Sequence, residues 1–405
     1  MIILKELLEK FRNNKDKIDQ FFNNNLSDPL FYNSVDLRHS GFKIAPVDVN
    51  CFPAGANNLS LSSRQIAKNC VNEFLDSNFP VATKIAIIPE NHTRNLKYLE
   101  NVLTLKEILE NGDKREVKII SLIDEIDNSL IIDLENNQQI TLEKLARNED
   151  NLTTANGFHP DLIISNNDFT DGVPEILKNT HQKIIPSLNL AWSGRKKSDH
   201  FRIYNQITEE FCQEIGLDPW LISTFYDCCE NINFKEKKGI DEVAEKVDKL
   251  LDKIREKYQK YGIDSEAYCY VKADNGTYGM GIMTVKSGAE ILAINKKERN
   301  KMNVIKGNTK NSSVIIQEGV PTTDLVQNSI AEPLIYLTCG KVVGNLFRAN
   351  NSRNTNISLN AAGMSFYDLN NLNQDEINLG LGRHDICEIY DVISRLSALA
   401  ASREV

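Results

Sequence analysis

Three glycines lie close together between two β-prone runs, and a lysine precedes them. In the stretch Tyr268–Val285 the sequence is Y-C-Y-V-K-A-D-N-G-T-Y-G-M-G-I-M-T-V, with Lys272 ahead of Gly276, Gly279 and Gly281. Glycines let a backbone turn tightly and approach a ligand closely, and the N–H groups of such a loop can surround phosphate oxygens. The stretch therefore predicts a strand–loop–strand flap over a nucleotide, with Lys272 supplying positive charge. A plain glycine-rich hairpin is the alternative.

The spacing of these glycines excludes two common phosphate-binding motifs. The sequence contains no G-x-x-x-x-G-K-[ST], so the loop is not a Walker A loop. Its order is G-x-x-G-x-G, and β-prone residues follow it, whereas a helix follows the glycines of a dinucleotide-binding fingerprint. Spacing alone leaves the phosphate flap and the plain hairpin both open.

A second stretch, residues 35–59, combines charged and amide side chains with apolar ones: V-D-L-R-H-S-G-F-K-I-A-P-V-D-V-N-C-F-P-A-G-A-N-N-L. Arginine pairs with a carboxylate through two hydrogen bonds, and aspartate accepts from an ammonium group. The stretch is thus suited to an amino-acid ligand, although a polar surface loop would look similar. Its polar members are Asp36, Arg38, Lys43, Asp48, Asn50, Asn57 and Asn58.

A short basic loop, S-G-R-K-K-S at residues 193–198, leads into a helix that we expect to run to about Ile215. Cations and free N–H groups at the start of a helix form an anion site. A solvated basic turn is the alternative interpretation.

The composition indicates a globular protein of ordinary type. The chain has 405 residues, which favours about two to three domains. Its 47 basic and 56 acidic residues give a net charge of −9, which disfavours general binding to nucleic acid. No apolar run approaches the ~18 residues of a membrane span, and no signal-peptide core is present. The eight cysteines lack C-x-x-C or zinc spacing, as expected of reduced thiols in a cytoplasmic protein.

The pattern of apolar residues predicts an α/β fold. Before residue 190, strands alternate with helices, which favours a largely parallel sheet. We expect helices near 2–24, 60–77 and 94–111, strands near 84–89, 117–122, 161–165 and 183–186, and a hairpin near 130–142. Further on we expect helices near 239–262, 287–296 and 385–403, a strand at 313–317, and a hairpin over 331–348.

These pieces in this order resemble the ATP-grasp fold. In that fold a helix that starts with basic residues ends near G-[IL]-x-x-P, here Lys196 to Pro219. A lysine-bearing strand and glycine flap follow, and then a strand ending in Q-E-G-V, here residues 317–320. An acidic residue, Glu332, opens the next hairpin, and Arg348 lies on its second strand. The segment closes with N-[LI]-x-x-G, here residues 360–363.

A closer resemblance is to the small proteobacterial glutamate–cysteine ligase family. The matching segments are residues 35–59, S-G-R-K-K-S-D-H-F at 193–201, V-K-A-D-x-G-T-Y-G-M-G-I-M-T-V at 271–285, A-E-P-x-x-Y at 331–336, and the C-terminal helix. The resemblance spans nearly the whole chain. Asn275 stands where alanine is expected, while the glycines and Lys272 are intact.

The resemblance implies a reaction that joins L-glutamate to L-cysteine with ATP and Mg²⁺, giving γ-glutamylcysteine, ADP and phosphate in the first step of glutathione synthesis. It implies an N-terminal α/β substrate domain, residues 1–190, followed by an ATP-grasp-like nucleotide-binding domain, residues 191–405. Two alternatives stay open: an ATP-grasp ligase with another acid–amine pair, and a non-catalytic nucleotide-binding regulator. The oligomeric state stays open as well.

The resemblance also implies roles for individual residues. Lys272 would neutralise phosphate charge, and Gly276, Thr277, Tyr278, Gly279 and Gly281 would cover the phosphates. Gln317, Glu318 and Val320 would border the adenine. Glu332 and Asn360, with Asn356 as a third candidate, would bind Mg²⁺ through oxygen. Arg348 and Arg195 would stabilise the transferring phosphoryl group, and Arg38, Asp48, Asn50 and Asn58 would hold glutamate. The plain alternatives are surface ion pairs for Glu332 and Arg348 and a turn cap for Asn360.

Overall fold

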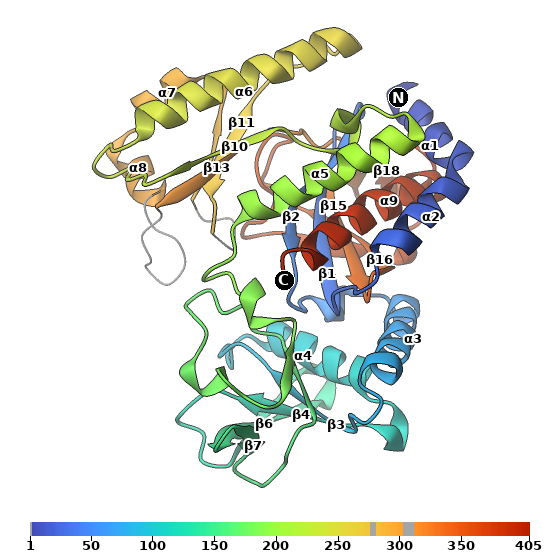
Figure 1. The fold of residues 1–405 in the computed structure, drawn as a ribbon, viewed down its shortest axis with the longest axis vertical. Coiled ribbons are helices and arrows are strands. Elements are labelled where there is room, and N and C mark those ends of the chain that lie inside the picture. The colour runs from blue at the N-terminus through green and yellow to red at the C-terminus, as the bar shows by residue number, and fades with distance from the viewer. Residues whose placement is uncertain (1, 276–280, 303–311) are drawn as a thin grey trace.

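The fold is built on three sheets, each with its own helices (Figure 1). It was analysed as a computed structural model, which describes residues 2–275, 281–302 and 312–405. The mixed α/β class expected from the sequence is confirmed. No helix in these ranges is long and apolar enough to cross a membrane.

The central sheet is antiparallel and joins residues from both ends of the chain. Its strands run in the order β17-β16-β15-β1-β2, and the short strands β14 and β18 pair at its side. Helices α1, α2, α5 and α9 form the layer beside it in Figure 1, where α9 packs on β1, β2 and β15. The strands are β1 (Tyr32–His39), β2 (Ile44–Asn50), β14 (Leu325–Val326), β15 (Ser329–Thr338), β16 (Lys341–Ala349), β17 (Ser365–Asp368) and β18 (Ile377–Asn378). The helices are α1 (Ile2–Asn13), α2 (Lys15–Asn25), α5 (Lys197–Ile215) and α9 (Arg383–Ser402).

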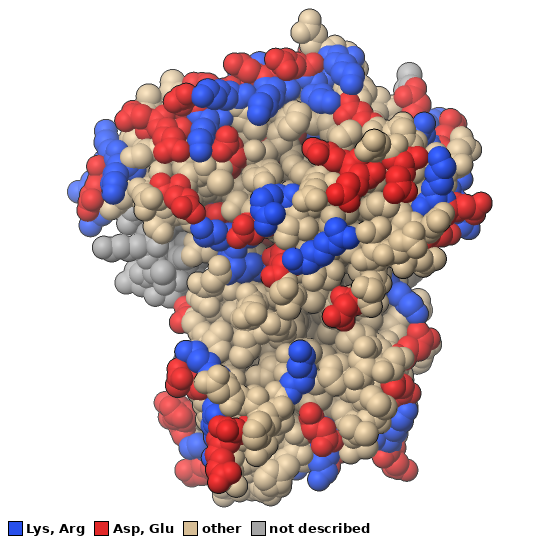
Figure 2. Space-filling model, in the orientation of Figure 1, with Lys and Arg blue, Asp and Glu red and all other residues tan. Residues whose placement is uncertain are grey.

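A second sheet, which we call the hairpin sheet, carries the glycine stretch. Its order is β10-β13-β11-β12, all antiparallel. The long helix α6 packs against it along the stripe of apolar residues expected from the sequence, and acidic and basic side chains alternate on its outer face (Figure 2). The elements are β10 (Tyr226–Glu230), α6 (Ile240–Tyr261), β11 (Cys269–Ala273), β12 (Ile282–Val285), α7 (Gly288–Ala293), α8 (Lys296–Met302) and β13 (Ser313–Glu318).

The third sheet, which we call the parallel sheet, runs in the order β5-β6-β4-β3-β8-β9, with β7 beside β6. The pairs β6–β4, β4–β3, β3–β8 and β8–β9 are parallel, as the alternating pattern predicts. A cluster of buried apolar side chains fills the space between this sheet and its helices. The elements are α3 (Leu61–Asn78), β3 (Lys84–Ile88), α4 (Leu96–Leu109), β4 (Glu116–Ser121), β5 (Ser129–Asp133), β6 (Gln139–Asn148), β7 (Asn151–Thr154), β8 (Leu162–Ser165) and β9 (Lys183–Ile185).

Two sequence expectations differ from the structure in detail. The helix expected over 2–24 is interrupted at Asn14 and forms α1 and α2. The stretch 35–59, for which a polar surface loop was one interpretation, forms most of β1 and all of β2. These strands pair with β15, so the central sheet draws residues from both sides of the domain boundary expected at 190.

Candidate functional site

A cavity of about 310 Å³ lies where the central sheet meets the loops of the parallel sheet. The central sheet contributes Asp36, Asp48, Asn50, Tyr336 and Arg348 to its wall. Loops beside the parallel sheet contribute Glu90, Asn166, Asp168 and Trp192, while Asn58 and Asn360 come from connecting segments. We call it the central cavity.

A buried network of ion pairs forms one wall of this cavity. The register of β15 and β16 places Glu332 opposite Arg348, and their side chains pair at 2.7 Å. The other oxygen of Glu332 accepts from Arg38 Nε at 2.8 Å. Arg348 also pairs with Asp36 at 3.1 Å. Burial raises the pKa of Asp36, although the attraction of Arg348 acts to lower it. The Nε of Arg348 is buried without a hydrogen-bond partner among the described residues.

Lys272 is buried near the cavity, and no described carboxylate lies within ion-pair distance of it. Its ammonium group donates to the carbonyl of Val47 at 2.8 Å, and Lys272 as a whole is 7% exposed. Burial lowers its pKa to about 8, although Asp48 favours the charged form. Lys197, by contrast, pairs directly with Asp48 at 2.6 Å. Among the described residues, Lys272 is thus a buried cation with carboxylates nearby but none in direct ion-pair contact.

The start of α5 already has an anion, supplied by the protein itself. The carboxylate of Asp274, next to the glycines, accepts from Ser198 N at 2.8 Å and from Ser198 Oγ at 2.7 Å. Lys197 N donates to the carbonyl of Asp274. The helix start that the basic loop 193–198 indicated as an anion site therefore anchors β11 and the residues that follow it.

Arg195, in the same basic loop, faces the C-terminal end of the chain. Its Nε and Nη2 donate to the two oxygens of Glu404 at 2.6 and 2.8 Å, and Nη1 donates to Val49 O at 2.7 Å. Its guanidinium lies over the ring of Trp192. Each of the three guanidinium nitrogens of Arg195 therefore has a partner, and its role at a phosphoryl group stays a prediction.

The end of β13 is fixed by a buried polar cluster. Glu318 accepts from Lys43 at 2.8 Å, from Trp220 Nε1 at 3.0 Å and from the backbone of Phe225 at 2.9 Å. Burial lowers the pKa of Lys43 to about 8, although Glu318 favours its charged form. A side chain at Gly319 would collide with the ring of Tyr268, so the backbone passes close to that ring.

The remaining sequence candidates fall into three groups. Gln317, Glu318 and Val320 are fully buried, and the Glu318 N–H already donates to Phe225 O, so their place beside an adenine stays a prediction. Asp48, Asn50, Asn58 and Asn360 line the central cavity, whereas Arg38 is bonded to Glu332 and to the carbonyls of Thr355 and Ile357. Gly276, Thr277, Tyr278 and Gly279 lie outside the described residues, and Gly281 has a positive φ of 61°.

Two of the three magnesium ligands expected from the sequence, Glu332 and Asn356, already have described side-chain partners. No group of three or more His, Cys, Asp or Glu side chains suited to a metal ion occurs within the described ranges. Both oxygens of Glu332 are engaged by arginines, and Asn356 offers its carbonyl to Tyr270. Asn360 is the member of the set that lines the cavity.

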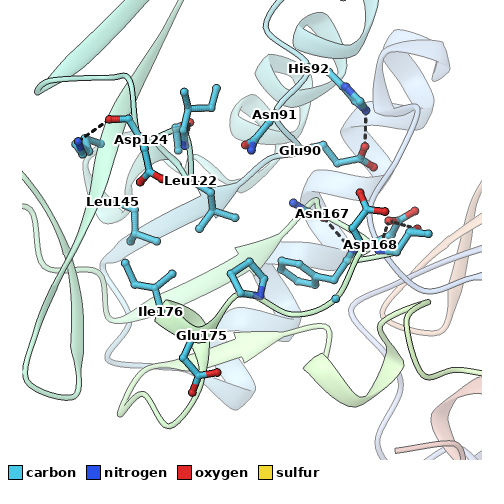
Figure 3. A pocket seen from close by; sticks show the side chains of 18 residues that line it. Glu90, Asn91, His92, Leu122, Asp124, Leu145, Asn167, Asp168, Glu175 and Ile176 are labelled. Carbon is cyan, nitrogen blue, oxygen red and sulfur yellow. Dashed lines mark hydrogen bonds and ion pairs between the residues drawn. The ribbon is translucent and has the colours of Figure 1, made fainter. Parts of the chain in front are cut away.

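A second cavity of about 490 Å³ lies at the carboxyl ends of β3, β4 and β8 (Figure 3). Glu90 and Asp168, which follow β3 and β8, line both this edge cavity and the central cavity. The sequence analysis did not select them, although it predicted both strands. Their signal is positional: ligands of α/β sheets bind beyond the carboxyl ends of strands where the strand order reverses, and β3 lies between β4 and β8.

Comparison with known proteins finds a family model and a solved structure that match nearly the whole chain. Residues 9–405 match the family model GshA, described as glutamate-cysteine ligase. The crystal structure of a protein named "Putative gamma-glutamylcysteine synthetase" from Methylobacillus flagellatus KT is 38% identical with a TM-score of 0.91, and the match covers 99% of this chain and 96% of that one.

More distant structures share little with this chain. A glutathione synthetase-like effector from Globodera pallida has 10% identity and a TM-score of 0.39, with 91% of this chain and 80% of that chain covered. D-alanyl-alanine synthetase A from Vibrio cholerae has 12% identity and a TM-score of 0.36, with 77% and 80% covered. Neither similarity is high enough to support an argument. No curated protein matched.

Proposed function

Because the chain belongs to the glutamate–cysteine ligase family, we propose that it joins the γ-carboxylate of L-glutamate to the amine of L-cysteine with ATP. The products would be γ-glutamylcysteine, ADP and phosphate, in the first step of glutathione biosynthesis. We infer an ATP-grasp-like arrangement, in which the hairpin sheet covers the nucleotide and the central cavity holds the acid.

The chemistry requires that the carboxylate be activated before the amine attacks. A carboxylate does not release its oxygen at neutral pH, so phosphorylation first converts it to an acyl phosphate with a good leaving group. Carboxylate and triphosphate repel each other, so the site must supply fixed positive charge more than a nucleophile. The described cysteines are all free, and none is needed in this scheme.

The observation that carries the proposal is the buried ammonium group of Lys272, whose described hydrogen-bond partner is a backbone carbonyl. A buried cation is costly unless an anion meets it, and no carboxylate forms an ion pair with Lys272 in the described part of the chain. It lies on β11, whose next residues enter the glycine stretch. A phosphate oxygen of ATP is the anion that would complete this position.

Glutamate is assigned to the central cavity. The unbonded Nε of Arg348 is a donor for a carboxylate or acyl phosphate oxygen, and Asp36 is an acceptor for an ammonium group. Asp48 lines the same wall, with both oxygens accepting from Lys197. Asn50, bonded through its side chain to the backbone of Phe52, would shape this wall. Arg38 acts here through Glu332 and the backbone, not as a direct ligand.

Magnesium does not fit the expected ligand set as the residues are arranged. A carboxylate whose two oxygens both accept from arginines has little capacity left for a hard cation, so Glu332 is poorly placed to bind it. Asn360 remains a candidate, and the set stays a prediction. None of the steps above depends on the ion.

The acceptor amine is assigned to the boundary between the two cavities. Asp168 lines both, and a carboxylate there can accept from the amine of cysteine. Replacing Asp168 with asparagine should raise the KM for cysteine about tenfold, the worth of a hydrogen bond to a charged group. The matched variant Asp124→Asn, at a residue that lines only the edge cavity, should leave it within twofold. Equal rises for cysteine and glutamate would contradict this assignment.

Binding of ATP should weaken above pH 8. Burial lowers the pKa of Lys272 to about 8, while Asp48, Asp36 and Asp274 raise it and Lys197 lowers it. Below this pH the ammonium group is charged. Above it the free enzyme loses the proton, so the Kd of an ATP analogue should rise toward tenfold per pH unit. Calorimetry between pH 7 and 9.5 measures this, and proton uptake near pH 8 should accompany binding. In Lys272→Met, the dependence of the Kd on pH that remains would come from Lys43, whose pKa burial also lowers to about 8.

The proposed function is tested by product formation. Purified protein with Mg-ATP, glutamate and cysteine should release ADP only when both amino acids are present, and the product should have the mass of γ-glutamylcysteine. ADP release with another acid–amine pair would favour a different ligase. ATP binding without ADP release, across a panel of acids and amines, would favour a non-catalytic regulator.

A further inference from the structure

Three consecutive backbone carbonyls after β16 are held by side chains from two different sheets. Arg38 of β1 donates from Nη1 to Thr355 O at 3.0 Å and from Nη2 to Ile357 O at 2.9 Å. Tyr270 of β11 donates from its hydroxyl to Asn356 O, between them, at 3.0 Å. We call residues 355–357 the clasp segment. It connects the central sheet to the hairpin sheet.

Arg38 and Tyr270, which make the shorter hydrogen bonds to the clasp segment, are themselves fixed, and Thr284 of β12 makes a longer one to Asn356 O at 3.5 Å. Arg38 is 3% exposed and its Nε is bonded to Glu332, while Tyr270 is 7% exposed and packs edge-on against Tyr268. A buried donor that loses its acceptor incurs the full cost of desolvation. A movement of the hairpin sheet relative to the central sheet must therefore either carry the clasp segment along or break one of these hydrogen bonds.

The clasp segment lies between the strand that carries Lys272 and the residues that line the central cavity. Tyr270 lies two residues before Lys272, so both side chains point to the same face of β11. On the other side, Asn360 and Met364 line the central cavity. Asn350 holds this part of the chain by donating to the carbonyls of Leu359, Ala361 and Ala362.

We propose that Tyr270 and Arg38 are positioning residues that couple β11 to the glutamate end of the central cavity through the clasp segment. ATP that binds at Lys272 on β11 would thereby fix Asn360 and Met364, so that each substrate binds more tightly when the other is present. This inference rests on the proposed function for the identity of the two ligands.

The chain provides a matched pair of variants that test the coupling. Tyr270→Phe removes the hydroxyl that holds Asn356 O. Tyr268→Phe makes the same change two residues earlier, where the hydroxyl is buried without a hydrogen-bond partner among the described residues. The measurement is the Kd of glutamate, by calorimetry, with and without a non-hydrolysable ATP analogue. Their ratio is the coupling factor.

In the wild type the analogue should tighten glutamate binding several-fold. In Tyr270→Phe the coupling factor should fall about fivefold, the worth of one buried hydrogen bond, while the Kd of glutamate alone stays within twofold. Tyr268→Phe should keep the wild-type factor. An unchanged factor in Tyr270→Phe, or a factor of one in the wild type, would overturn the inference.

A second measurement needs no variant and no amino acid. The ATP analogue alone should slow amide hydrogen exchange in residues 354–364 of the wild type, and unchanged exchange in a nucleotide-bound sample would refute the coupling. Turnover of the wild type with glutamate, cysteine and ATP separates the two proposals. If turnover occurs but the coupling and the exchange are unaffected, the inference fails and the proposed function stands. If exchange slows without turnover, the coupling stands and the proposed function fails.

Discussion

Replacing Lys272 with methionine is expected to lower kcat/KM for ATP by at least about a hundredfold. Removing one preorganised donor to a developing charge costs that much or more in enzymes. Stability should not fall, because the change removes a buried ammonium group whose pKa burial has already lowered to about 8. Lys272→Met should therefore separate activity from folding, as measured by steady-state kinetics and thermal unfolding of the same sample.

A lysine in the same part of the fold provides the control. Lys286 follows β12 and forms an exposed ion pair with Glu266. Lys286→Met should leave both kinetics and stability close to those of the wild type, since exposed pairs contribute little. If Lys272→Met retained full activity, the ammonium group would not contact phosphate, and the observation that carries the proposed function would be lost.

Replacing Glu332 with alanine is expected to lower the free energy of unfolding by about 3–5 kcal/mol, the usual cost of breaking a buried ion pair. Glu332 neutralises both Arg38 and Arg348, and all three are buried. Arginine cannot release its proton to escape burial. The variant would therefore leave two guanidinium groups without their shared carboxylate. Urea denaturation of the wild type and the variant measures the difference.

A surface carboxylate shows what the loss of an ordinary ion pair does. Glu73 pairs with Lys341 at 2.7 Å, and both side chains are more than half exposed. Glu73→Ala should change the free energy of unfolding by no more than about 1 kcal/mol. Similar values for the two variants would mean that water replaces Glu332 beside the arginines and that the network contributes little to folding.

Local patterns in the sequence predicted most elements near the site. The apolar stripe of residues 239–262 and the buried run 313–317 correspond to α6 and β13. The lysine and glycines of residues 272–281 were predicted to lie in a hairpin, and β11 and β12 pair as expected on either side of the residues that are not described. These features depend on neighbours in the chain, which periodicity and turn chemistry record.

Partners far apart in the chain were not predictable. Arg38 pairs with Glu332, and its carbonyl acceptors lie 317 and 319 residues away, contacts that no motif indicated. Its expected role toward glutamate stays a prediction. Glu404, which engages both Arg195 and His200, belongs to no motif. Burial lowers the pKa of His200. Burial alone would raise the pKa of Glu404, but its hydrogen bonds and attraction to Arg195 and His200 outweigh burial and lower that pKa to about 2. Which charged side chains pair depends on strand order and register, and no periodic pattern in the sequence indicates these contacts.

The pairing of β1 with β15 has a consequence for the order in which the chain can fold. Tyr32 lies opposite Thr338 in the register of these strands, so the early strands cannot complete their sheet until roughly 300 later residues have left the ribosome. At synthesis rates of about 5–20 residues per second, this delay lasts on the order of 15–60 s. The parallel sheet, whose strands all lie within residues 84–185, can close earlier. During that interval β1 and β2 would expose Val35, Leu37 and Ile44, and chaperones that bind apolar segments of nascent chains would find targets there.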